Sequence, residues 1–139
     1  MRETESFEFW SDQFTIDPGE EQQTAHGAHG QALAQWLRAN LAPDGERLVL
    51  HDGCWRLMLR REPYGLWIAC GNITDMRQEP RPVQPLAWWC QVRADVSFWN
   101  WLVRERLLGD ISPNDDIRAA GLRLAALLRS NPRIWDLAR

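Results

Sequence analysis

The stretch that decides the fold reads ERLVLHDGCWRLMLR and spans residues 46–60. Residues 46–51 and 54–60 are both rich in side chains that favour strands, and Asp52-Gly53 separates them. An Asp-Gly pair is typical of a two-residue hairpin turn, because both positions of that turn need a positive φ. The stretch therefore predicts a β-hairpin.

Three other stretches on either side of this hairpin are predicted to be strands. Residues 6–16 alternate between apolar and polar side chains, as a half-buried strand does. Residues 66–70 are apolar on both faces, which is typical of a central strand, and residues 87–93 follow as the last predicted strand. The prolines in residues 75–85 indicate an irregular connection between these two strands.

Three helices are predicted from apolar side chains that recur at helical spacing. They cover residues 28–41, residues 98–108 with Ser97 as the N-cap, and a long last helix that begins at Ser112-Pro113. The side chains expected to face inward are Leu33, Trp36, Leu37 and Leu41 in the first helix, Phe98, Trp101, Leu102 and Leu108 in the second, and Ile117, Leu124 and Leu128 in the third.

The resulting element order is β-α-β-β-β-β-α-α. It predicts an α+β fold with one mostly antiparallel sheet of four to five strands and three helices packed on a face of the sheet. The length of 139 residues fits one domain, residues 1–139, with a single hydrophobic core.

Composition gives expectations about the cellular compartment and the thiols. No apolar run reaches the ~18 residues of a membrane span, and residues 1–12 are acidic with scattered aromatics, unlike a secretory signal. We therefore expect a cytoplasmic protein without a membrane partner. The chain has three cysteines, an odd number, and their spacing is irregular; they are Cys54, Cys70 and Cys90. We therefore expect reduced, buried thiols rather than a disulfide framework.

Few residues have the spacing of a catalytic or metal-binding motif. His26, His29, His51 and Cys54 are weak candidates for zinc ligands, and Cys54 with His26 or His51 is a weak candidate for a nucleophile and its base. Their spacings match no established motif, and all 16 basic residues are arginine, which excludes lysine chemistry. We predict a protein that is not an enzyme, with no catalytic residues, metal or cofactor.

Charge is distributed unevenly along the chain. Residues 1–52 carry ten acidic residues and three arginines, a net charge of −7, whereas residues 53–139 carry nine acidic residues and thirteen arginines, a net charge of +4. An acidic surface suits a partner with a basic active site, because complementary charge accelerates encounter and favours that partner. The residues predicted to bind this partner are Asp17, Glu20, Glu21, His26 and His29.

The arginines of the hairpin and of the last predicted strand allow another interpretation. Arg56, Arg60, Arg61 and Arg93 alternate with tryptophans, as in surfaces that bind single-stranded nucleic acid. The same residues also fit a lattice of arginines and carboxylates. The net charge of −3 and the absence of a nucleic-acid-binding motif disfavour nucleic acid as the partner.

Several stretches together resemble small bacterial proteins of the toxin-immunity kind. They are FTIDPGEE at residues 14–21, GQALAQWL at 30–37, GCW at 53–55 and YGLWIACGN at 64–72. The resemblance implies a protein-binding module that neutralises one cognate bacterial toxin, of the contact-dependent or type VI secretion type. The alternatives are a small metal- or thiol-dependent enzyme and a nucleic-acid-binding or adaptor domain.

Overall fold

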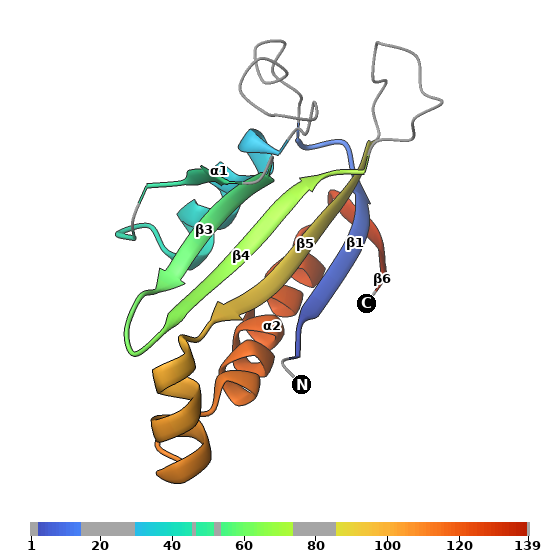
Figure 1. Cartoon of the computed structure of the whole chain (residues 1–139). Helices are drawn as coiled ribbons and strands as arrows, with labels where there is room; N and C mark the ends of the chain where they lie inside the picture. The colour runs from blue at the N-terminus through green and yellow to red at the C-terminus, as the bar shows by residue number, and fades with distance from the viewer. Residues whose placement is uncertain (1–2, 15–29, 46, 52–53, 74–85, 139) are drawn as a thin grey trace.

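The computed structural model describes residues 3–14, 30–45, 47–51, 54–73 and 86–138 (Figure 1). These residues form an α+β fold with a six-stranded antiparallel sheet and three helices, which confirms the predicted fold class. In chain order the elements are β1 (Glu5–Ser11), α1 (Gln31–Leu41), β2 (Val49–His51), β3 (Cys54–Arg60), β4 (Gly65–Asn72), β5 (Leu86–Asp95), the π-helix η2 (Asn100–Leu107), α2 (Pro113–Ser130) and β6 (Ile134–Ala138).

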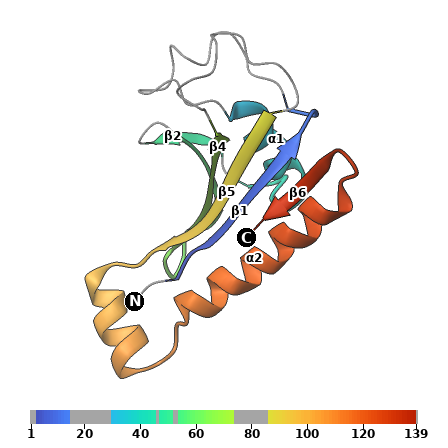
Figure 2. The same cartoon turned by 90° about the vertical axis from the view of Figure 1, so that its right-hand side faces the viewer.

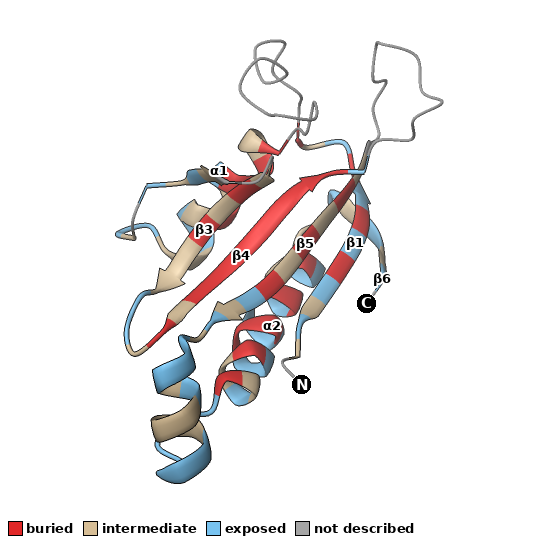
Figure 3. Cartoon of the chain, viewed as in Figure 1, coloured by how far each residue is buried: buried red, intermediate tan, exposed pale blue. Residues whose placement is uncertain are grey.

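The strands lie in the order β2-β3-β4-β5-β1-β6. The predicted hairpin is confirmed by the pairing of Leu50 with Trp55 and of His51 with Cys54, although its turn lies outside the described residues. The predicted central strand, β4, pairs with β3 on one side and β5 on the other. Residues Leu66–Asn72 are all buried, which explains why this strand lacks alternation (Figure 3).

Both α1 and α2 lie on the same side of the sheet, and the side view shows α2 running along it (Figure 2). The core fills the space between the helices and the sheet. The predicted stripe of α2, which is Ile117, Leu124 and Leu128, is fully buried there, as are Leu33 and Leu37 of α1. The sheet contributes Phe7, Phe9, Leu57, Ile68, Trp88 and Val92 to the same cluster.

Strand β6 was not predicted, and it brings the sheet to six strands within the described residues. It pairs with β1 at the sheet edge, with Ser11 opposite Ile134 and Trp10 opposite Trp135. The strand is only five residues long, and Asp136 has a positive φ of 53°. A short strand interrupted by such a residue lacks the regular alternation by which a strand is predicted.

The prediction that residues 98–108 pack inward is wrong. No residue of η2 is buried, and Phe98 and Leu108, two of the residues expected to face the core, are 63% and 68% exposed. The helix continues from the end of β5 and extends beyond the sheet, where it has no layer to cover (Figures 1 and 2). In this π-helix the N–H of residue i+5 donates to the carbonyl of residue i, as Leu108 N does to Val103 O, so the spacing of an α-helix does not define its faces.

Candidate functional site

The residues predicted to bind a partner, namely Asp17, Glu20, Glu21, His26 and His29, lie outside the described residues. Two acidic residues of the described N-terminal segment, Glu3 and Asp12, are engaged within the chain. Asp12 forms an ion pair with Arg133 at 3.0 Å, and Glu3 forms one with Arg118. The described part of the predicted acidic surface is thus partly neutralised by arginines of the C-terminal half.

The weak candidates for a metal or nucleophilic site are only partly described. The side chains of His26, His29 and His51 are outside the described residues, and Cys54 is half-buried at the start of β3. Within the described ranges, no three histidine, cysteine, aspartate or glutamate side chains lie close enough to share a metal ion.

The other two cysteines are buried opposite each other in the sheet. Cys70 of β4 pairs in register with Cys90 of β5, and both are buried and reduced, as predicted. Burial raises the pKa of the Cys90 thiol far above its ordinary value, because the thiolate would lose its hydration. These thiols therefore act as small apolar side chains of the core rather than as nucleophiles.

The arginines of the sheet face opposite the helices are held by aromatic and carboxylate side chains. The Arg56 guanidinium stacks 3.4 Å from the ring centre of Trp67, and Arg93 lies 5.5 Å from the same ring. Asp95 accepts hydrogen bonds from Trp67 Nε1 at 3.1 Å and from Arg56 at 3.4 Å. Trp67 is only 5% exposed, so its ring is not available for stacking on a base.

Arg60 is held in a similar way at the other end of β3. It lies 5.0 Å from the Tyr64 ring centre and donates a 2.6 Å hydrogen bond to Asp116 of α2. The Tyr64 hydroxyl donates to the same carboxylate. The lattice interpretation of these arginines is thereby favoured over a nucleic-acid surface, since Arg56 and Arg60 already have acidic partners.

The most conspicuous surface lies on and beside η2. We call it the η2 cluster, and it consists of Phe98, Trp99, Trp101, Leu107 and Leu108. Trp99 is 70% and Leu107 72% exposed, and the rings of Phe98 and Trp101 lie 5.8 Å apart. Large apolar side chains gathered on one exposed element are typical of interaction sites, and tryptophan is enriched among the residues that dominate binding energy.

Three residues of the cluster, Phe98, Trp101 and Leu108, were predicted to face the core, whereas the sequence pattern did not single out Trp99 or Leu107. A signal was present, because Phe98 and Trp99 are adjacent in the chain. Adjacent residues on a helix point about 100° apart, so both cannot lie on the centre of one buried stripe. A helix with aromatics in adjacent positions must leave one of them at its edge or exposed.

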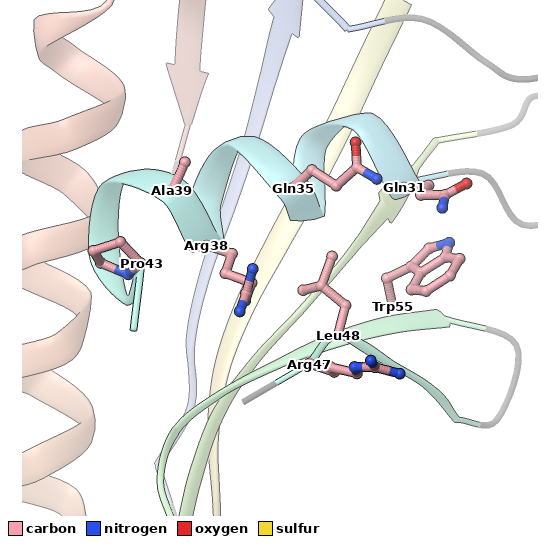
Figure 4. Close-up of a pocket in the computed structure, with 8 residues that line it drawn as sticks. All are labelled: Gln31, Gln35, Arg38, Ala39, Pro43, Arg47, Leu48 and Trp55. Atoms are coloured by element: carbon pink, nitrogen blue, oxygen red, sulfur yellow. The ribbon is translucent and has the colours of Figure 1, made fainter. Parts of the chain in front are cut away.

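A pocket of about 480 Å³ lies between α1 and the β2–β3 hairpin (Figure 4). Its polar side chains are Arg38, Arg47, Gln31 and Gln35, and its apolar side chains are Ala39, Pro43, Leu48 and Trp55. No sequence pattern indicates this pocket, because its residues come from α1, from the segment between α1 and β2, and from β3, and share no motif.

Two donors of this pocket have no protein partner within the part of the chain that is described. Trp55 is 9% exposed, and its Nε1 is buried without a hydrogen-bond acceptor. Arg47 is exposed and forms no ion pair there. Arg38 is fixed by a 3.0 Å hydrogen bond to the carbonyl of Gly45. The pocket is therefore rich in donors beside an apolar wall.

None of the described helices is long and apolar enough to cross a membrane. No family model, curated protein or solved structure matches this chain.

Proposed function

We propose that this chain is a non-enzymatic protein-binding module that neutralises a cognate bacterial toxin. The observation that carries the proposal is the η2 cluster, in which Phe98, Trp99 and Leu107 are each more than 60% exposed. Phe98 and Trp99 directly precede η2 and Leu107 is its last residue, and none of residues 97–110 is buried, so packing against the body of the chain does not account for these side chains. Their burial against a partner would account for them.

The geometry of η2 favours a particular kind of partner surface. The helix projects from the end of β5 beyond the sheet (Figure 2). None of its residues is buried, so no face of it is covered by the sheet. A helix that carries exposed apolar side chains beside charged ones typically lays its apolar face into a hydrophobic groove of its partner. Each aromatic side chain buries ~150–250 Å² when covered, so three of them supply a large part of a standard interface.

The polar side chains beside the cluster fit a rim rather than a second anchor. Arg104 pairs with Asp110 at 3.3 Å, and both side chains are more than one-third exposed. Arg106 is exposed on the last turn of the helix. We expect these charges to affect the rate of association, and the apolar cluster to determine the rate of dissociation.

The toxin is the partner to test first, and the gene adjacent to that of this chain is the first place to look for it. We expect the purified chain to bind the product of that gene and to block its toxicity. Trp99→Ala should weaken this binding by ~30-fold or more, the loss typical of a dominant interface residue. Calorimetric titration with the purified product measures it.

Leu122→Ala is the matched control, because Leu122 is 63% exposed, as Phe98 is, but lies on α2. It should leave the affinity unchanged, while circular dichroism shows that both variants fold. Equal binding by the Trp99 variant and the wild type would refute this surface. A dimer of the chain that dissociates on Trp99→Ala would assign the cluster to self-association instead.

A further inference from the structure

The pocket between α1 and the β2–β3 hairpin carries an inference that is independent of the toxin proposal. We propose that it binds a small organic anion, with a flat apolar body and a single carboxylate or phosphate group. Its volume of about 480 Å³ lies in the ~300–1,000 Å³ range of small-molecule sites. The proposal depends on the charge of the pocket and on the side chains of its walls.

The described side chains that line the pocket carry a net positive charge. Arg38 and Arg47 line it, and no acidic side chain is among the described residues that do so. Arg38 presents a fixed charge, because the carbonyl of Gly45 holds its guanidinium. Arg47 is exposed and without an ion pair in the described ranges, so its guanidinium is available to a carboxylate or phosphate.

The walls of the pocket explain the apolar body of the ligand. Leu48 and Trp55 rise from the hairpin side, and Ala39 and Pro43 come from the end of α1 and the loop after it (Figure 4). A flat ring fits between such surfaces better than a hydrated inorganic ion does. Free phosphate or sulfate would leave these walls uncovered.

The indole of Trp55 is the second, independent observation. Its Nε1 is a buried donor without an acceptor, and buried donors are nearly always paired. Figure 4 shows the nitrogen on the edge of the ring that faces the Gln31 end of the pocket. Because Nε1 itself has almost no exposed surface, the indole must turn before an acceptor oxygen of a ligand in the pocket can satisfy it.

The test uses the full chain labelled with ¹⁵N and three probes, namely phenylacetate, phenyl phosphate and neutral phenylacetamide. The indole N–H signal of Trp55 is assigned as the one lost in Trp55→Phe, or from the sequential assignment if that variant does not fold. We expect at least one of the two anions to shift this signal saturably, and phenylacetamide to bind at least ~10-fold more weakly. The anion that binds more tightly identifies the acidic group.

Arg47→Gln should weaken binding of that anion by ~10-fold, because it removes the guanidinium that pairs with the acidic group. The substitution should have little effect on folding, since the Arg47 side chain is exposed. Arg129→Gln is the matched control, since Arg129 is exposed on the last turn of α2 and the substitution changes the net charge equally. Trp99→Ala should also leave binding unchanged, which separates this site from the η2 cluster.

Three results would overturn the proposal. The first is that the Trp55 indole signal does not move with either anion at ~10 mM, a concentration that reveals even millimolar affinity. The second is that phenylacetamide shifts it as strongly as the anions do. The third is that Arg47→Gln and Arg129→Gln weaken binding equally, which would assign the effect to the overall charge of the protein.

Discussion

Two consecutive helices of this chain, η2 and α2, differ in almost every property that holds a helix in place. Helix α2 buries seven residues, and its stripe of Ile117, Leu124 and Leu128 is fully covered by the sheet. Helix η2 buries none and leaves Trp99 and Leu107 largely exposed. Only a few residues, including Gly109, separate the two helices.

The difference shows that apolar content does not by itself decide which segment becomes core. Residues 98–108 contain three aromatics and three leucines, whereas α2 contains alanines, leucines and arginines. Helix α2 is buried because its apolar side chains lie on a single stripe that faces the sheet. We infer that α2 stabilises the fold and that η2 supplies the binding surface.

The largest expected effect tests whether α2, and not η2, stabilises the fold. It compares the substitution of a leucine by alanine in each helix. Leu124→Ala should lower the free energy of unfolding by about 3 kcal/mol, because it opens a cavity beneath α2. Leu107→Ala should change it by less than ~0.5 kcal/mol, since the side chain is 72% exposed. Urea titrations followed by circular dichroism measure both changes. Similar losses would show that η2 also supports the fold.

A second test uses alkaline pH, which changes the stability of the fold through the buried Cys90 thiol of β5 and not through η2. Burial raises the pKa of Cys90 above its ordinary value of 9.0, so the folded state retains a proton that the unfolded state releases. This contribution to stability is fully present below pH 9 and is lost as the pH rises further. We expect a loss of about 1 kcal/mol at pH 10 from this group.

Cys90→Ala removes the titrating group and should make the stability less dependent on pH between 8 and 10, whatever its effect on absolute stability. Urea titrations at several pH values provide the comparison with the wild type. An unchanged alkaline slope would indicate that the Cys90 thiol titrates normally and is less enclosed than its burial implies.

Local patterns predicted most of the body of the molecule. The Asp-Gly hairpin, the stripe of α2, the central strand and the α+β class follow from periodicity and turn chemistry, which depend on neighbours along the chain. Sequence reasoning could not place η2, because whether a helix lies over the sheet depends on the direction in which β5 ends. It also missed β6, whose pairing with β1 joins residues more than 120 positions apart.

The candidate sites were less accessible from the sequence. The predicted acidic contact residues lie in residues 15–29, outside the described part of the chain, so that prediction stands untested. The pocket depends on Trp55 and Arg47 meeting α1, which is a property of the packing of the hairpin. The arginines of the sheet do not all share one site, because Arg56 pairs with Asp95 of β5 and Arg60 pairs with Asp116 of α2. Which carboxylate each arginine meets depends on how these elements pack.

The test with the smallest expected effect compares two carboxylates. Asp116 lies in the first turn of α2, and Asp110 lies just after η2. Asp116 of α2 accepts hydrogen bonds from Arg60 and Tyr64 and so ties the helix to the β3–β4 turn. Asp116→Asn should cost about 1 kcal/mol, because these groups are partly exposed and solvent weakens their interaction. Asp110→Asn, which loses only the exposed pair with Arg104, should cost less than ~0.5 kcal/mol. Thermal unfolding of both variants at low and high salt measures the difference, and equal costs would mean that α2 is held by its apolar stripe alone.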